Sequence, residues 1–148
     1  MKPMQKRQGN MLGKTMIAII AFSPAIAFSD NQDHAVRERV NAGLNIAGAA
    51  KTLVNDNVKN AAPDFSRGWT SQGMSGLNPF VHSIMIDPDS GVITVNYTEQ
   101  AKKISISLIP SAGGAGLVAG KTPFEDIIWR CAVSDAGSNK YVPDNCRL

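Results

Sequence analysis

The stretch from residue 31 to residue 57 constrains the fold most, because its pattern is that of one long amphipathic helix. Apolar side chains recur there at steps of three, four or seven residues: Val36, Val40, Leu44, Ala47 and Val54. This spacing puts them on one face of a helix. Gly43 and Gly48 lie in the same stretch, where small residues permit the close approach of another backbone. Such a helix needs a second apolar layer from the rest of the chain.

The second half of the chain has the pattern of an antiparallel sheet. Residues 81–86 are apolar and end in a turn sequence, and residues 92–97 and 104–109 alternate apolar and polar side chains. Residues 127–133 predict a fourth strand. We therefore predict an α+β fold in which the helix packs on a four-stranded antiparallel sheet with one solvated face. The side chains expected to face the helix are Ile84, Ile86, Ile93, Val95, Ile104, Ile106, Leu108 and Trp129.

Two segments lack this periodicity and are predicted to be loops. Residues 59–80 are rich in Gly, Ser, Asn and Pro, and we expect Trp69 to pack against the core there. Residues 110–124 are rich in glycine but lack the GK[ST] ending of a phosphate-binding loop. Neither loop therefore predicts a cofactor site.

The first 27 residues differ from the rest in charge. They contain four basic residues and no acidic one, which leaves 11 basic against 12 acidic residues from Phe28 onward. The formal net charge of +3 therefore comes from a leader and gives no strong signal for nucleic-acid binding. We assign residues 1–27 to a leader or signal-like segment and residues 28–148 to a head domain.

An apolar run in this leader, from Met16 to Phe28, has 13 residues and includes Pro24. At about 1.5 Å per residue it would span about 20 Å as a helix, less than the roughly 30 Å of bilayer hydrocarbon. Its length suits the apolar part of a signal peptide, and Ala25-Ile26-Ala27 at its end matches the A-x-A cleavage pattern. Cleavage between Ala27 and Phe28 would leave a soluble protein of 121 residues.

Two cysteines, Cys131 and Cys146, lie near the C-terminus with 14 residues between them. The chain has two histidines and no CxxC pair, so the sequence gives no metal-ligand cluster. In an exported protein a disulfide bond is the expected state of such a pair, and it would contribute about 3 kcal/mol to the free energy of unfolding.

Several of these segments together resemble the type IV pilins. The segment QDHAVRERVNAGLNIAGAAKTLV is similar to the part of a pilin helix that leaves the membrane and crosses the head domain. SIMIDPDSGVITVNYTEQ, ISISLIP, IIWRCAV and KYVPDNCR follow in the order and spacing of a pilin head. The paired cysteines, the tryptophan two residues before the first and the proline before the second belong to the same pattern. The resemblance covers about residues 29–147.

The leader departs from the pilin pattern in its anchor. Prepilins resemble one another at a basic leader, a glycine, then FTLIE and a long apolar run. Here Gly13 is followed by Lys14 in place of phenylalanine, and Ala18 stands where the family has a glutamate that pairs with a neighbouring subunit's terminal amine. Two processing sites therefore remain open: Gly13–Lys14 for prepilin processing and Ala27–Phe28 for signal-peptidase processing.

The resemblance implies a structural subunit without catalytic activity, cofactor or metal, with a role in pilus assembly and cell adhesion. Its partners would be other pilin subunits, the assembly machinery and a host or surface receptor. It would be exported to a type IV pilus or anchored in the inner membrane, with membrane contact only through its N-terminal segment.

The loop bounded by the cysteines is the region through which the family contacts receptors and neighbouring subunits. Its candidate contact residues here are Ser134, Asp135, Ser138, Asn139, Lys140 and Tyr141. The short anchor and Ala18 predict a minor or atypical subunit. The alternative is a soluble periplasmic or secreted module that modulates pili or binds another partner.

Overall fold

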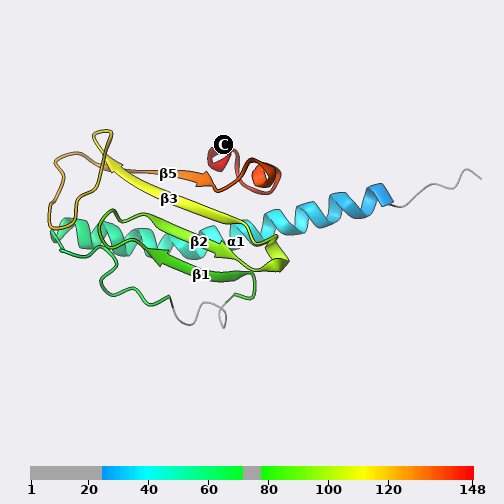
Figure 1. Cartoon of the computed structure of the whole chain (residues 1–148), viewed down its shortest axis with the longest axis horizontal. Helices are drawn as coiled ribbons and strands as arrows, with labels where there is room; N and C mark the ends of the chain where they lie inside the picture. Colours follow the sequence, from blue (N-terminus) through cyan, green and yellow to red (C-terminus); the bar gives the residue numbers. More distant parts are fainter. Residues whose placement is uncertain (1–24, 72–77) are drawn as a thin grey trace, which may run out of the picture.

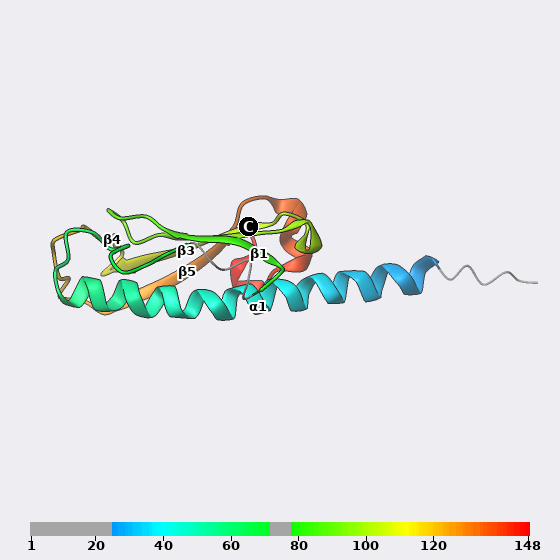
Figure 2. The same ribbon diagram turned by 90° about the horizontal axis from the view of Figure 1, so that it is seen from below.

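One long helix and one antiparallel sheet make up the architecture of the computed structural model, which describes residues 25–71 and 78–148. The helix, α1 (Ala25–Lys59), runs along one face of the sheet and continues beyond it at its N-terminal end (Figure 1). A view turned by 90° shows the helix and the sheet as two separate layers (Figure 2). The predicted α+β fold is therefore confirmed.

The sheet contains four main strands and one short strand. The main strands are β1 (Val81–Ile86), β2 (Ile93–Tyr97), β3 (Ser105–Ala112) and β5 (Ile127–Val133), each antiparallel to the next in that order. The short strand β4 (Ala115–Gly116) pairs with the end of β3. The predicted bounds of β1 and β5 are confirmed, and the sheet has one strand more than the pattern predicted.

The predicted loop at 110–124 begins too early, because β3 continues past Pro110 to Ala112. Gly113 and Gly114 have φ angles of 57° and 79° and form the two-residue turn into β4, a conformation that glycine adopts without strain. Pro110 fits in β3 because β2 begins at Ile93, opposite Leu108, and does not reach Pro110. No strand on that side therefore requires the N–H that proline lacks. The alternation of the sequence stops at this proline, which explains the early end of the predicted strand.

The helix is longer than the predicted 31–57 and buries the predicted apolar face. Along α1 the buried side chains are Val36, Val40, Ala47, Ala50, Val54 and Val58. The prediction took the polar run at 55–57 as the end of the helix. Instead, the Asn57 amide donates to the backbone carbonyls of Phe65 and Arg67, both at 2.9 Å, and holds the following loop.

The sheet residues predicted to face the helix form the other half of the core. Seven of the eight are buried, and Trp129 is partly buried against the same cluster. The Trp129 indole nitrogen donates to the Asn55 side chain on α1 at 3.3 Å. Trp69 also packs against the core, as expected, and its indole nitrogen donates to the Ile84 carbonyl at 2.8 Å.

Tyr97 on β2 makes a close contact with α1. Its hydroxyl donates to the Val40 carbonyl at 2.6 Å, and burial raises the pKa of the Tyr97 phenol above its ordinary range. The ring occupies the space beside Gly43, where an added Cβ would overlap it. A Cβ on Gly48 would meet no atom within 4 Å. At Gly43 the nearest atoms belong to the Tyr97 side chain and not to another backbone, and at Gly48 nothing approaches closely, so the expected approach of a backbone is found at neither glycine.

Candidate functional site

The predicted disulfide bond is present and bounds the C-terminal loop. Cys131 on β5 is bonded to Cys146 in the short helix η3 (Asp144–Cys146), with 4.5 Å between their Cα atoms. Cys146 is buried, and Cys131 packs against the edge of the core. Between them lies a second short helix, η2 (Ala136–Tyr141). Residues 131–146 are named the disulfide loop below.

Side chains within and beside the disulfide loop fix its shape. Asp135 caps η2, because its carboxylate accepts from the Ser138 backbone N–H at 3.0 Å and from the Ser138 hydroxyl at 2.8 Å. The Asn139 side chain exchanges hydrogen bonds with the Leu148 backbone, at 3.0 and 3.4 Å. Arg147 donates to the Asn139 carbonyl at 3.1 Å. The loop is thus ordered by local polar contacts in addition to the covalent bond.

The disulfide loop also docks on α1. The Lys140 ammonium lies 2.9 Å from the Asp33 carboxylate, and Arg37 donates to the Lys140 backbone carbonyl at 2.7 Å. The Lys140 ammonium also lies 4.7 Å from the centre of the Tyr141 ring. The contacts of Lys140 with Asp33 and Arg37 join residues more than 100 positions apart. They hold the loop against the helix, near the point where α1 extends beyond the sheet (Figure 1).

The charges in this contact stabilise each other. The hydrogen bond from Lys140, assisted by Tyr141, lowers the pKa of the Asp33 carboxyl, and the same contact with Asp33 raises the pKa of Lys140. Both groups are therefore charged at neutral pH. Because the pair lies at the surface, it is a positioning contact more than a large source of stability.

The structure uses most of the predicted contact residues within the subunit itself. Asp135, Ser138, Asn139, Lys140 and Tyr141 all contribute to the contacts described above. Ser134 differs: its backbone N–H continues the pairing with Ser105, at 2.9 Å. Its exposed hydroxyl makes no hydrogen bond within the described part of the chain. Partner binding by these six residues remains a prediction.

Asp33 and Arg37 are the residues of this site that the sequence did not indicate. Both lie on the polar side of a predicted helix, where charged residues need no partner. Their contacts with Lys140 span 107 and 103 positions. No local pattern in one sequence encodes a contact of that range.

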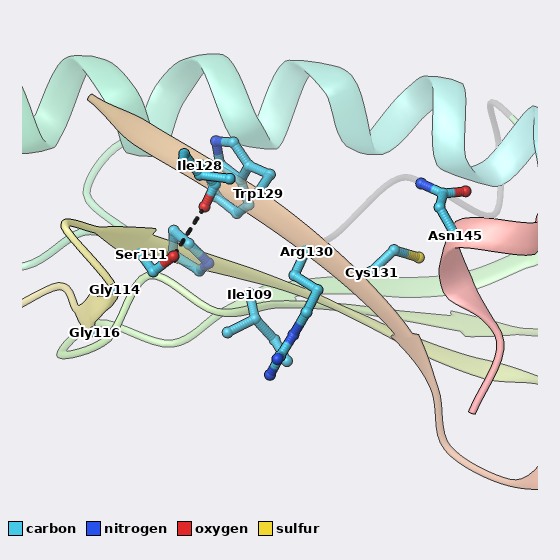
Figure 3. Close-up of a pocket in the computed structure, with 10 residues that line it drawn as sticks. Ile109, Ser111, Gly114, Gly116, Ile128, Trp129, Arg130, Cys131 and Asn145 are labelled. Atoms are coloured by element: carbon cyan, nitrogen blue, oxygen red, sulfur yellow. Dashed lines mark hydrogen bonds between the residues drawn. The ribbon is translucent and has the colours of Figure 1, made fainter. Parts of the chain in front are cut away.

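A hollow of about 510 Å³ lies along β5 beside the disulfide loop. Figure 3 shows Ile109 and Arg130 on the side of the sheet away from α1, and Trp129 on the side toward the helix. Arg130 is the only charged side chain among the lining residues, and Asn145 closes one end. This lining offers surface for contact but no acid and base in proximity.

The two processing candidates differ in what the structure describes. Gly13 and Lys14 lie outside the described residues, whereas the backbone at Ala27 and Phe28 is part of α1. Among the helices of the described ranges, none combines the length and the apolar character needed to cross a membrane. The boundary between leader and head at residue 27 remains a prediction.

The described head thus combines a long helix that extends beyond an antiparallel sheet with a disulfide loop docked on that helix. The family model for pilin, a bacterial filament protein, matches residues 36–147. The match begins at Val36, a buried residue of α1, and includes the disulfide loop. This chain therefore belongs to the pilin family, whose members are structural proteins that assemble with other pilin subunits into filaments at the cell surface.

Proposed function

We propose that this chain is a minor or atypical subunit of a type IV pilus, active in pilus assembly and adhesion and not in catalysis. The observation that supports this proposal is a contrast within the chain. The head has a complete core and a docked disulfide loop. The apolar run of the anchor sequence has only 13 residues, and these include Ser23 and Pro24.

The anchor supports a minor role for two reasons. A short apolar run buries less surface against neighbouring helices, and burial is worth about 25 cal/mol per Å². In addition, Ala18 offers no carboxylate to the terminal amine of a neighbouring subunit. An amine without a partner is costly in an apolar filament core. Incorporation would therefore depend on other pilins that carry a full anchor.

The disulfide loop supports a role in adhesion. Ser134, Asp135 and Lys140 are exposed, and the loop is stiffened by its bond and its contacts with α1. A rigid polar surface loses little entropy when it binds a receptor or a neighbouring subunit. The proposed ligand contacts are hydrogen bonds to these three side chains.

The alternative is a soluble periplasmic or secreted module, which Ala25-Ile26-Ala27 favours. Cleavage after Ala27 would remove only the first three residues of α1, and burial in the described head begins at Val36. Both mature forms would thus retain the head.

The mature N-terminus and the location of the protein test these two functions. Pili are sheared from the producing cells, and the N-terminus is determined by mass spectrometry in the pilus and periplasmic fractions. A minor subunit gives trace incorporation of a chain that begins at Lys14. A chain found only in the periplasm and beginning at Phe28 establishes the alternative, and filaments made of this chain alone would contradict a minor role.

A variant at the anchor tests the reason for low incorporation. Ala18→Glu restores the carboxylate and should raise the amount of this chain in sheared pili relative to the total. Ala18→Gln is the matched control, because it has similar size without the charge and should have little effect. Equal incorporation of the two variants would show that charge pairing is not limiting.

A further inference from the structure

We propose that the loop at one end of the head docks into a groove at the other end of the head of a second copy of this chain. The loop, named the distal tip, is residues 123–126. The groove, named the proximal groove, lies between residues 32–39 of α1 and residues 99–102. This inference rests on the proposed function as a pilus subunit and adds which surfaces of two subunits meet.

The distal tip presents one aromatic and two acidic side chains to solvent. Phe124 is fully exposed, although an aromatic ring gains more from burial than most side chains. Glu125 and Asp126 follow it and are exposed. Lys59 lines the hollow beside the tip, yet neither carboxylate forms an ion pair or hydrogen bond within the described residues. The tip therefore offers an apolar ring followed by two carboxylates that have no ion-pair partner within the described residues.

The proximal groove has the complementary character. It is an open hollow of about 290 Å³, and its apolar lining comes from Ala35 and from the small exposed part of Val36. A cavity of about 150 Å³ holds a benzene molecule, so a phenyl ring fits. Arg39 and Lys102 line the same groove and supply positive charge.

The charges around the groove leave it net positive. Glu99 also lines it, but its carboxylate is paired with Lys103 at 2.7 Å. The Arg39 guanidinium is fixed by a 2.6 Å hydrogen bond to the Gln100 carbonyl and lies 5.1 Å from the centre of the Phe80 ring. Lys102 is exposed and forms no ion pair within the described part of the chain. Glu125 and Asp126 of a second copy would therefore meet Arg39 and Lys102.

The two surfaces lie at opposite ends of the head. The tip borders Asn55 on α1 and the groove includes Arg39, which is about 24 Å away along the helix at 1.5 Å per residue. Figure 1 shows the loop before β5 and the turn after β2 at opposite ends of the sheet. Because each copy carries one tip and one groove, the contact is asymmetric. Repetition of such a contact produces an open chain of subunits, as a filament requires.

The contact is small and needs a high local concentration. One aromatic side chain and two charge pairs make a weak interface, which would be populated where subunits are already concentrated, in a membrane or a filament. Copies that enter a pilus would then lie next to one another. Such head contacts would partly compensate for a short anchor.

Disulfide cross-linking of the purified full-length chain tests the contact directly. Pro123→Cys and Gln100→Cys are combined in one chain, which is oxidised at high protein concentration in detergent. We expect a ladder of dimers, trimers and longer products from the double variant and monomers from each single variant. A ladder that ends at dimers, or equal cross-linking of a single variant, would overturn the asymmetric contact, as would complete absence of products.

Side-chain variants in this double-cysteine chain test which side chains stabilise the contact. Phe124→Ser should lower the cross-linking yield at least tenfold, since burial of a phenylalanine is worth about 1.5–3 kcal/mol. Ile128→Ser is the matched control, because Ile128 is also exposed but lies outside the tip. Equal yields in these two variants would reject docking by Phe124.

Reversed charges provide the final measurement. Asp126→Lys should lower the yield about threefold, within the range of an exposed charge pair, and Lys102→Glu in the same chain should restore it. Restoration specific to this pair supports the assignment, and its absence rejects the proposed charge contact. The cross-linking result is independent of incorporation into sheared pili, so failure of one does not imply failure of the other.

Discussion

Two parts of the molecule attach to α1, and they do so by different forces. From Val36 to Val58 the helix is held by the sheet through buried apolar side chains. Nearer its N-terminus it is held by the disulfide loop through Asp33 and Arg37, which contact Lys140 at the surface. Buried apolar contacts respond little to salt and pH, whereas exposed charge pairs respond to both.

The difference indicates which part of the head can change without loss of the fold. Beyond the end of β5 at Val133, the loop contains only short helical turns, and much of its surface is exposed. Such a region opens locally at a lower free energy than the core. We therefore expect changes in the core to unfold the head and changes in the loop to release it from α1 first.

Ile106→Ala should have the largest effect. Ile106 is fully buried in the centre of the sheet, so the truncation should lower the free energy of unfolding by about 2–5 kcal/mol. Denaturant unfolding followed by circular dichroism measures this change. Ile128→Ala, on the exposed side of β5, is the control and should cost less than about 0.5 kcal/mol. Equal effects would refute the assignment of the two sheet faces.

Cys131→Ser should have the next largest effect on the free energy of unfolding. Its effect should appear first in the disulfide loop. Loss of the disulfide should cost about 3 kcal/mol for a loop of this length. Hydrogen exchange should show faster exchange in the disulfide loop before any change in β1 or β2. Cys146→Ser should give the same pattern, because it removes the same bond. Uniform acceleration across the sheet would mean that loop and core unfold together.

Gly43→Ala should have an intermediate effect on the free energy of unfolding. The added Cβ would overlap the Tyr97 ring, and overpacking costs about 1–3 kcal/mol. The higher helix propensity of alanine offsets about 1 kcal/mol of this. Gly48→Ala is the matched control in the same helix and should stabilise the head, because the site is open. Thermal unfolding of the two variants should therefore shift in opposite directions.

Asp33→Asn should have the smallest effect, confined to the contact between the loop and α1. The Asp33 pKa is lowered, so its stabilising contribution is present above the ordinary pKa of about 4 and is lost as pH falls through the folded value. The Lys140 pKa is raised, so its contribution is present below its ordinary pKa of about 10.4 and is lost as pH rises through the folded value.

Hydrogen exchange of residues 136–141 as a function of pH and salt measures this contact. The wild type should protect these residues best between the two pKa values and at low salt. Asp33→Asn should flatten both dependences. His34→Asn is the control on the same helix, because His34 is exposed and pairs with Glu38 instead of the loop. An unchanged profile in Asp33→Asn would show that the charge pair does not hold the loop.

The sequence predicted the core better than the surface contacts. Apolar runs marked β1 and β5 to the residue. Period-two alternation located β2 and β3 within three residues of their bounds, because a sheet with one buried face imposes that period. It missed β4, whose two residues, Ala115 and Gly116, are too short to show a period. The Asp33–Lys140 pair and the exposure of Phe124 depend on how distant segments meet. Neither follows from local spacing.

The indole of Trp69 has a consequence for how these heads behave when crowded. A strand at the side of a sheet can recruit a strand from another molecule, and a sheet open at both sides can do so without limit, as in amyloid. Trp69 lies against β1, and its indole nitrogen donates a hydrogen bond to the Ile84 carbonyl. A strand pairing with β1 would require this carbonyl as an acceptor. Because β1 is obstructed, two heads could pair only through their β5 edges. That pairing uses the one free edge of each sheet, so it would end at a dimer. We therefore expect heads packed at filament density to resist unlimited β-aggregation.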